Sequence, residues 1–212
     1  MELDPKARDA KTIYRLLLAC VVPRPIAWVT SMSAEGATNL APFSFFMAHC
    51  SNPPIISISV GPREGKEKDS RRNIEETGEF VVNVVTEELL DAVLVSARDY
   101  GPDVSEIKEA GLTRLPSRKV RPPRIAESPI QMECRLHQAV YLGEERPGWA
   151  MLLGEVVHFH VADELYEDGY LSARFSPLGR FYGPLYCRTN DRIHRKVTWA
   201  AYRENVKQPK TP

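Results

Sequence analysis

The chain has 212 residues, 43% of them hydrophobic, which is enough for the core of one large domain or two small ones. Its 28 Lys and Arg residues balance 28 Asp and Glu residues, so no global field would gather nucleic acid or a membrane surface, and any anion must be held locally. The apolar run 16–22 is too short for a membrane span and ends in prolines rather than in a signal-peptide cleavage site, so we expect neither a membrane nor nucleic acid as a partner.

The N-terminal part of the chain predicts a helix and then a hairpin. Asp4-Pro5 predicts a capped helix start, and Pro23 and Pro25 end the helix. Its apolar face consists of Ile13, Leu16, Leu17 and Cys20. The stretch "PIAWVTSM" alternates as a strand does, "AEGATN" contains the Gly and Asn of a turn, and "LAPFSFFMAHC" returns as the second strand.

The middle of the chain predicts two strands with a short helix between them. The β-branched runs 55–60 and 79–85 indicate the strands. In "KDSRRNIEETG", Asp69 or Ser70 can cap the helix and Gly78 can close it. Two further short helices are predicted over 86–97 and 104–111, and a loop or irregular edge over 116–129.

The last part of the chain predicts two long strands, 130–143 and 149–163, joined by a turn. Asp168-Gly169 predicts another tight turn, and the segment 176–189 is too rich in aromatics and glycines for a regular helix. Six or seven strands without βαβ alternation indicate a mainly β protein with short helices. We expect an antiparallel barrel with the helices packed outside it rather than a doubly wound sheet.

A basic segment surrounds the helix start at 68–70. Lys66, Lys68, Arg71 and Arg72 lie near free backbone N–H groups and the positive end of a helix dipole, a combination that favours a phosphate, and Ser70 can add a hydroxyl. The alternative is a solvated charged loop that neighbouring acidic residues neutralise.

The stretch 39–54 mixes aromatic and small polar residues. A planar ring with polar edges needs an apolar wall and a few donors and acceptors at its rim. Phe43, Phe45 and Phe46 can supply the wall, and the rim candidates are Ser44, Cys50, Ser51 and Asn52. The alternative is an ordinary aromatic core followed by a turn at Asn52-Pro53.

Common catalytic motifs are missing from the sequence. It contains no G-x-S-x-G, H-E-x-x-H, P-loop or G-x-G-x-x-G pattern, so we expect no catalytic side chain of those types. His158 and His160 share one face of a strand but have no evident third ligand, so no metal site is expected. The four scattered cysteines form no C-x-x-C pair, which fits a reducing compartment, and we expect the cytoplasm.

Several of these segments together resemble one family. The order and spacing of "PRPIAWVTS", "GATNLAPFSFF", "SNPP", "KDSRRNIEETGEFVVN", "LLGEVV" and "PLGRFYG" resemble the flavin reductase-like, FMN-binding split-barrel proteins. The resemblance covers about residues 10–190. It implies a single domain over 1–212 with a C-terminal extension at 191–212, and a split β-barrel that forms a homodimer with one FMN per subunit near the interface.

The resemblance also implies a set of cofactor-binding residues. The flavin ring would lie against Ser44, Phe45 and Phe46, with Thr30, Asn39, Cys50 and Ser51 at its polar edge or the ribityl chain. The phosphate would lie near Lys68, Asp69 and Ser70 and pair with Arg71, while Arg180, Phe181 and Tyr182 close over the ring, from the same or the second subunit. In this family Ser70 is often threonine and Cys50 often serine or another small residue, so Cys50 offers a weaker polar group.

The implied activity is hydride transfer from NADH or NADPH to FMN, with flavin N5 rather than a protein side chain performing the chemistry. Reduced flavin could then pass to a partner oxygenase or another electron acceptor. One alternative is an FMN-binding electron carrier or oxygenase without its own nicotinamide turnover. A second alternative is a cofactor-free barrel that acts as an interaction module.

Overall fold

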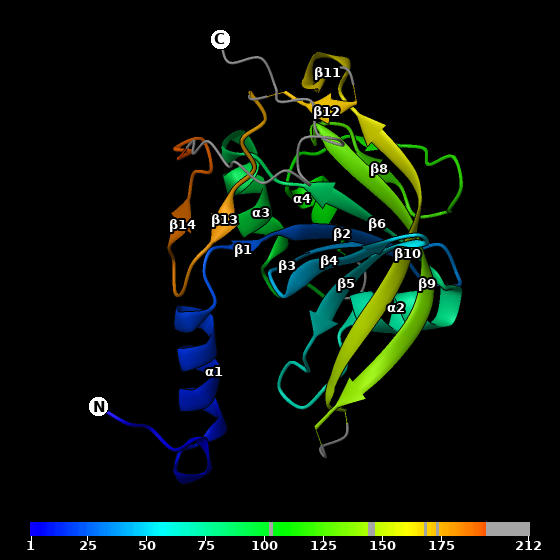
Figure 1. Ribbon diagram of the computed structural model, residues 1–212. Coiled ribbons are helices and arrows are strands. Elements are labelled where there is room, and N and C mark those ends of the chain that lie inside the picture. The colour runs from blue at the N-terminus through cyan, green and yellow to red at the C-terminus, as the bar shows by residue number, and fades with distance from the viewer. Residues whose placement is uncertain (102–103, 144–146, 168, 173, 194–212) are drawn as a thin grey trace.

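A computed structural model describes residues 1–101, 104–143, 147–167, 169–172 and 174–193. Its main feature is a seven-stranded antiparallel sheet in the order β3-β2-β6-β9-β10-β5-β4 (Figure 1). The strands are β2 (Ala27–Met32), β3 (Thr38–Phe43), β4 (Phe46–Ser51), β5 (Pro54–Val60), β6 (Glu79–Val84), β9 (Ile130–Leu142) and β10 (Trp149–Val161). The alternating and β-branched runs therefore form strands where the sequence predicts them.

The two edges of this sheet are consecutive in the chain. β3 and β4 lie at opposite ends of the strand order, yet only Ser44 and Phe45 connect them. The sheet therefore curls until its edges approach, and no ladder closes them, which leaves the barrel split. Phe45 is held beside β5, because its carbonyl accepts a hydrogen bond from the Ser59 N–H at 2.8 Å. The predicted second strand of the first hairpin is thus two strands with a bend between them.

Close packing at Gly154 helps the sheet to curl. The register of β10 against β9 shifts between Leu153 and Gly154. A Cβ at Gly154 would lie 2.3 Å from the Phe80 ring, so glycine is required for that ring to fill the barrel.

Two apolar cores lie on the two faces of the sheet. Along β2, Ala27 and Val29 point into the barrel, whereas Trp28 packs with Leu40 under the outer helices. The period-2 alternation of a strand accounts for this division. The outer core positions α3 (Leu90–Ser96) and α4 (Glu106–Glu109) against β3.

The helices differ from the sequence-based expectation in three places. Asp4-Pro5 begins only a 3-10 turn, η1 (Pro5–Ala7), and α1 (Ala10–Cys20) starts after Asp9, whose carboxylate accepts the Thr12 N–H at 2.9 Å. Asp9 thus provides a second N-cap, and the regular helix begins there rather than at Asp4-Pro5. The helix predicted over 86–97 is η2 (Glu87–Leu89) followed by α3, and α2 (Asp69–Thr77) has Lys68 rather than Asp69 or Ser70 at its N-cap.

Short strands complete the architecture. β1 (Arg24–Pro25), β13 (Gly179–Arg180) and β14 (Tyr186–Cys187) form a small sheet beside the split of the barrel (Figure 1). Two hairpins are also present. One consists of β7 (Arg114–Leu115) and β8 (Arg124–Ile125). The other consists of β11 (Tyr166–Glu167) and β12 (Tyr170–Leu171) and follows the 3-10 turn η3 (Asp163–Leu165). Asp168 lies outside the described residues. Within the described ranges, no helix has the length and hydrophobicity that crossing a membrane requires.

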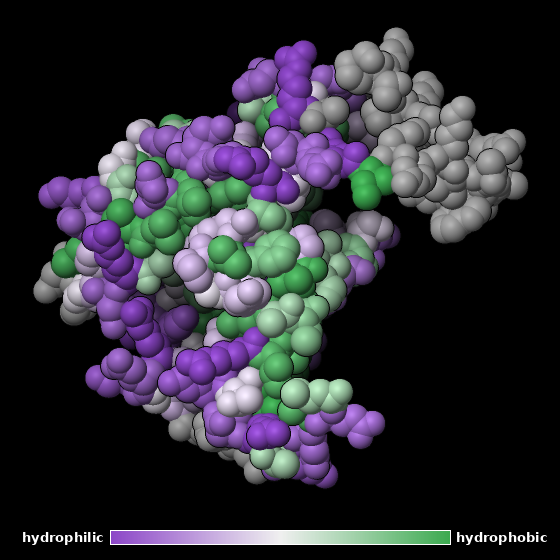
Figure 2. All heavy atoms as spheres, turned by 90° about the vertical axis from the view of Figure 1, so that its left-hand side faces the viewer, coloured by the Kyte–Doolittle hydropathy of each residue, from purple (hydrophilic) through white to green (hydrophobic). Residues whose placement is uncertain are grey.

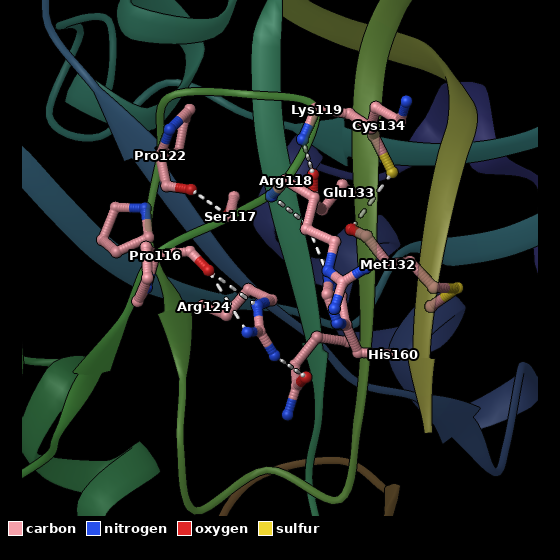
Figure 3. Close-up of polar contacts among 12 residues, drawn as sticks. Pro116, Ser117, Arg118, Lys119, Pro122, Arg124, Met132, Glu133, Cys134 and His160 are labelled. Carbon is pink, nitrogen blue, oxygen red and sulfur yellow. Dashed lines mark hydrogen bonds and ion pairs between the residues drawn. The ribbon is translucent and has the colours of Figure 1, made fainter. Parts of the chain in front are cut away.

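The loop that contains β8 is held to the barrel by a buried carboxylate. Glu133 of β9 is fully buried and accepts hydrogen bonds from the backbone N–H groups of Arg118 at 2.8 Å and Lys119 at 2.6 Å (Figure 3). His160 of β10 contacts the same carboxylate, Nε2 to Oε1, at 2.5 Å. The proline-containing segment 116–129, predicted as irregular, is therefore held to the barrel by Glu133 together with other strand residues such as Glu79 and Asn83.

Candidate functional site

A polar groove of about 470 Å³ follows the open edge of β3 to the N-terminus of α2. Its far wall is the end of α3 and the residues after it. Among its lining residues are Asn39, Pro42, Arg63, Lys66, Lys68, Ser70, Arg98, Tyr100 and Glu106. Since β3 pairs only with β2, the groove runs along an unpaired strand edge.

Lys68 is the most distinctive cation of the groove. Its side chain is partly buried and its ammonium lies 5.4 Å from the centre of the Phe43 ring. Burial lowers the pKa of Lys68, the nearby Arg63 lowers it further, and Asp99 opposes the shift. Among the described residues, no carboxylate forms an ion pair with Lys68, so there its ammonium has no directly bound anion.

The N-terminus of α2 borders the same groove. The helix has Lys68 at its N-cap and no side chain caps it by a hydrogen bond. The first N–H groups of a helix have no partner within the helix and carry partial positive charge. Together with the ammonium of Lys68, these groups provide the donors that an anionic oxygen requires.

A chain of side chains links β3 to α2 and α4. The Asn39 amide and the Ser70 hydroxyl are 2.7 Å apart, and with the amide oxygen turned toward Ser70 the amide nitrogen donates to Glu106 at 3.1 Å. Glu106 also accepts the Leu40 N–H at 3.3 Å. Burial raises the pKa of Glu106, and the nearby Asp69 raises it as well. Neighbours on β3 and α4 therefore hold the Ser70 hydroxyl of α2 in position.

Most other carboxylates of this region already have cationic partners. Asp69 pairs with Arg72 at 2.5 Å, and Asp99 pairs with Arg63 at 3.4 Å. These pairs reduce the repulsion that an incoming anion would meet. Asp69 lies in the first turn of α2, where a carboxylate is favourable, rather than at the cap itself.

Ser44 lies in the bend directly after β3, beyond the residues that line the groove. The Ser44 hydroxyl accepts a hydrogen bond from Nε of Arg24 at 3.2 Å, and the Phe181 carbonyl accepts one from Nη2 of the same arginine at 2.7 Å. Arg24 is 4% exposed. It therefore fixes the bend after β3 against the segment that contains Arg180 and Phe181.

Two of the predicted site residues face away from the groove. Thr30 is fully buried on β2 and donates its hydroxyl hydrogen to the Pro123 carbonyl at 2.5 Å. Arg71 pairs with Glu67 at 3.0 Å and Glu75 at 2.9 Å. Because residues four apart lie on one side of a helix, these pairs direct Arg71 along α2 instead of toward its N-terminus.

Phe45 and Phe46 lie on either side of the bend. Phe45 stacks on Trp149, with ring centroids 5.4 Å apart, and Tyr14 of α1 lies 6.3 Å from it. Phe46 lines a different cavity, which is described below. Of the three phenylalanines predicted as a wall for the ring, only Phe43 thus lies beside a cation of the groove, while Phe45 joins an aromatic cluster.

Cys50 and Ser51 lie at the opposite end of β4 from the bend. Both are exposed, and the Cys50 thiol donates to the Pro53 carbonyl at 3.1 Å. They do not line the groove of the same protomer.

Sequence reasoning missed one wall of the groove. Arg98, Tyr100 and Glu106 follow or belong to the short helices α3 and α4 and reach β3 only in the folded chain. The charged and aromatic run "ARDY" directly after a helix was an available signal, since such residues at a helix end are often part of a site.

A second cavity of about 690 Å³ is larger and almost entirely apolar. It lies beneath β13 and the hairpin β11–β12, and its walls include Ile26, Phe46, Phe159, Tyr170 and Phe175. A phosphate would find few partners there, so this cavity does not compete with the groove as an anion site.

The histidine pair lies on the outer surface of the barrel. The rings of His158 and His160 are 4.6 Å apart, and His160 is engaged by Glu133. Among the described residues, no three His, Cys, Asp or Glu side chains are grouped as a metal would need. The four cysteines are free thiols.

The groove presents hydrogen-bond donors and positive charge to an anionic group. The uncapped start of α2 and Ser70 lie beside Asn39, and the ammonium of Lys68 lies further along β3, beside Phe43. The bend at Ser44 follows directly after Phe43. An anionic oxygen is therefore the ligand group that these residues suit.

Comparison with known proteins agrees with this description. The flavin reductase like domain matches residues 18–183, so the chain belongs to the flavin reductase-like family, whose chemistry is flavin oxidoreduction. An uncharacterised protein of Halalkalibacterium halodurans is 44% identical over 190 residues, which are 88% of this chain and 91% of that one.

Two solved structures share the whole fold. Nitrilotriacetate monooxygenase component B from Bacillus cereus has a TM-score of 0.88 and 38% identity, over 92% of this chain and 98% of that chain. The 2-nitrobenzoate 2-nitroreductase of Pseudomonas fluorescens has a TM-score of 0.83 and 34% identity, over 93% of this chain and 96% of that chain. A flavin reductase with a split barrel domain from Shewanella frigidimarina, 20% identical, has the same fold at a TM-score of 0.77. The predicted fold class, an antiparallel split β-barrel, is confirmed.

Proposed function

We propose that this protein binds FMN in the groove along β3 and transfers hydride to it from NADH or NADPH, as a flavin reductase-type oxidoreductase. The observation that carries the proposal is the partly buried ammonium of Lys68, which has no ion-pair partner among the described carboxylates and lies at the uncapped start of α2. A single basic end favours the one terminal phosphate of FMN over the diphosphate of FAD.

The residues of the groove divide into two functions. Lys68, the Ser70 hydroxyl and the first N–H groups of α2 hold the phosphate, and Asn39 keeps Ser70 in position. Ser44 and the backbone of the bend lie along the ring, and Arg24 fixes their position. The bound flavin supplies the hydride-accepting ring, so the chain has to orient two rings rather than move a proton.

This assignment explains why the groove contains no pair of acid and base side chains. Hydride transfer between two planar rings requires no protein proton donor, and its rate depends on how the rings are placed. Burial raises the pKa of the groove residue Glu106. Because its partners are Asn39 and the Leu40 N–H, we assign it a structural rather than a catalytic role.

The similar proteins favour two continuations of the reaction. Nitrilotriacetate monooxygenase component B is by name one component of an oxygenase, which supports delivery of reduced flavin to a partner oxygenase. The 2-nitrobenzoate 2-nitroreductase is by name a reductase of an organic substrate, which supports direct use of the flavin on a small molecule. We place the protein as a homodimer in a reducing compartment such as the cytoplasm, in agreement with its four free thiols.

Absorption spectroscopy tests the proposal in two steps. Purified protein, incubated with FMN and desalted, should keep a flavin band, and stopped-flow mixing with NADH or NADPH should bleach it. A band that neither nicotinamide bleaches would instead favour the electron carrier or oxygenase without nicotinamide turnover. Protein that stays colourless would favour the interaction module, and FAD retained in place of FMN would contradict the phosphate assignment.

A further inference from the structure

The apolar cavity of about 690 Å³ has a floor made by the two longest strands. In the register of β9 against β10, Met132 lies opposite Phe159 and Ile130 lies opposite Val161. All four residues line the cavity, because residues paired across a ladder, and residues two apart along a strand, point to the same face. In the described ranges, β5 pairs with β10 only as far as Glu155, so this floor extends past the end of β5.

The roof of the cavity comes from the chain that follows β10. The hairpin β11–β12 contributes Tyr166, Tyr170 and Leu171, and Phe175 precedes β13 (Figure 1). The three residues of the hairpin are exposed, and so is Phe159 on the floor. Floor and roof therefore present apolar side chains to a hollow between them and do not close over one another.

A hollow of this kind suits a small apolar molecule better than it suits water. Apolar side chains that face water cost hydration free energy, and cavities lined by aliphatic and aromatic residues stay dry and take up molecules such as benzene. Sites for small molecules occupy about 300 to 1,000 Å³ and have mostly apolar walls. The volume and the surface of this cavity are those of such a site.

The lining restricts the charge of the ligand. Arg24 is the one charged residue among the described residues of the wall, and it is almost fully buried. Its Nη1 donates to the carbonyls of Leu18 at 2.6 Å and Val21 at 2.8 Å, and its other nitrogens donate to Ser44 and to the Phe181 carbonyl. A charged ligand would therefore lose its hydration without gaining an ion pair.

The lining also indicates the shape of the ligand. Aromatic rings reach the cavity from separate parts of the chain: Phe46 of β4, Phe159 of β10, and Tyr170 and Phe175 of the roof. Aromatic rings attract one another in stacked and edge-on arrangements, beyond the area that they bury. We propose that this cavity is a second ligand site, which binds an uncharged aromatic compound.

This second site is separate from the groove along β3. The cavity and the groove share no residue of their linings. Phe46 of the cavity wall follows the bend 44–45 directly, so the two sites lie on either side of that bend. The inference therefore does not rest on the proposed binding of FMN.

Isothermal titration calorimetry with three related compounds tests the ligand class. 2-Naphthol is uncharged at pH 7, 2-naphthoate carries a carboxylate on the same ring, and 2-decalinol is the saturated alcohol. We expect one 2-naphthol per chain with a Kd of about 0.01 to 1 mM. 2-Naphthoate should bind at least about tenfold more weakly, because its charge finds no free cation, and 2-decalinol about two- to tenfold more weakly.

A matched pair of variants tests the place of binding. Leu171→Trp puts a larger side chain into the cavity from β12, and Leu94→Trp on α3 is the control, since Leu171 is 43% and Leu94 is 46% exposed. Leu171→Trp should weaken 2-naphthol binding at least about tenfold, and Leu94→Trp should leave it within about twofold. Added FMN should leave it within about threefold. Circular dichroism verifies the fold of both variants.

Four outcomes would overturn the inference. Wild-type protein that binds no 2-naphthol would show that the cavity takes no such ligand, and a lower mass of Leu171→Trp in light scattering would then assign it to a second copy of the chain. Equal affinities for 2-naphthol and 2-naphthoate would contradict the ligand class. Wild-type affinity in Leu171→Trp, or displacement of 2-naphthol by FMN, would place the ligand outside this cavity.

Discussion

At the scale of single residues, Lys68 should favour cofactor binding without stabilising the apoprotein. Its lowered pKa means that the folded chain holds the ammonium in a less favourable environment than the unfolded chain does. A lysine kept in this way contributes nothing to the stability of the apoprotein, and a bound phosphate would remove the cost. Stability and cofactor affinity should therefore respond in opposite directions when this charge is deleted.

We expect Lys68→Gln to weaken FMN binding by about 10- to 100-fold, the range of one charge-assisted hydrogen bond, and to leave riboflavin binding within about twofold. The melting temperature of the apoprotein should stay equal or rise. Quenching of flavin fluorescence gives both affinities, and Lys11→Gln on the exposed face of α1 is the control. Equal losses for FMN and riboflavin would show that Lys68 does not contact the phosphate.

The charge of Glu106 should oppose phosphate binding, whereas the charge of Lys68 should favour it. A raised carboxyl pKa means that the folded state binds the proton more tightly than the unfolded state, so its stabilising contribution is present at low pH and is lost as the pH rises through the folded pKa. Once ionised, the Glu106 carboxylate also repels a phosphate dianion in the groove.

Glu106→Gln keeps an oxygen that can accept the Leu40 N–H but removes the charge. We expect it to bind FMN about two- to tenfold more tightly than wild type at pH 8, because one repulsion is lost. The difference should shrink as the pH falls and Glu106 becomes protonated in the wild type, and riboflavin should show no difference at any pH. Titrations at several pH values check this; a wild-type advantage at pH 8 would mean that Glu106 binds the ligand directly.

At the scale of elements, β9 and β10 hold the long loop 116–122 through one buried carboxylate. Burial by itself raises the pKa of Glu133, but the hydrogen bonds from Arg118, Lys119 and His160 outweigh it and the net pKa is lowered. The pKa of His160 is also lowered, chiefly by burial. Both shifts mean that the unfolded chain binds more protons than the folded chain, so acid destabilises this unit.

The free energy of unfolding should therefore fall as the pH drops below the ordinary histidine pKa of 6.5, and fall further below the ordinary glutamate pKa of 4.5. We expect Glu133→Gln to cost about 1 to 3 kcal/mol at pH 7, since it weakens bonds to buried donors, and to flatten the acid limb below pH 5. Urea unfolding at a series of pH values measures this. Glu127→Gln, an exposed carboxylate of the same region, is the control, and an acid limb identical to wild type in Glu133→Gln would contradict the assignment.

At the scale of the whole molecule, exposed apolar side chains indicate an interface. Met47 on the edge strand β4 is 56% exposed and Phe159 on β10 is 55% exposed. Figure 2 shows hydrophobic residues extending across the face that carries α1 and the small sheet, between hydrophilic borders. An edge strand with an exposed apolar side chain, and an extended hydrophobic area on the surface, are both typical of a protein that a partner covers.

We expect a homodimer that uses β4. Light scattering after size exclusion should give twice the 24.0 kDa of the chain, about 48 kDa. Met47→Glu should shift the protein toward the monomer and weaken FMN retention, since the resemblance places the flavin near the interface. Leu94→Glu, which alters an apolar residue on α3 that is 46% exposed, is the control. A monomeric wild type that binds FMN would contradict this expectation.

Much of the fold could be predicted because local patterns determine it. The alternation of Ala27, Trp28 and Val29 determines which face of β2 enters the barrel, and the positive φ of Gly78 ends α2 where the sequence indicates. Lys68 and Ser70 are candidates because a phosphate site needs a helix start with basic and hydroxyl residues beside it, and all of these are neighbours in the sequence; that they bind a phosphate stays a prediction.

Other features depended on contacts that no local pattern contains. Thr30 and Arg71 were candidates by position, but Thr30 meets the carbonyl of Pro123, 93 residues away, and Arg71 meets Glu75 on its own helix and Glu67 just before it. Glu106 became part of the groove because α4 packs against β3. Cys50 follows the bend closely in sequence, yet the direction of β4 carries it away from the groove.

By itself, therefore, the sequence determined most of the strands and the end of α2, and it indicated a basic helix start that suits a phosphate, because these depend on residues within about one turn or one strand of each other. Only the tertiary structure decided which side chains converge on the groove, which of its charges are already paired, and that Nη1 of Arg180 lacks an acceptor. The physical reason is that charge compensation and burial are properties of neighbours in space, and the neighbours of Arg180 and Glu106 come from distant parts of the chain.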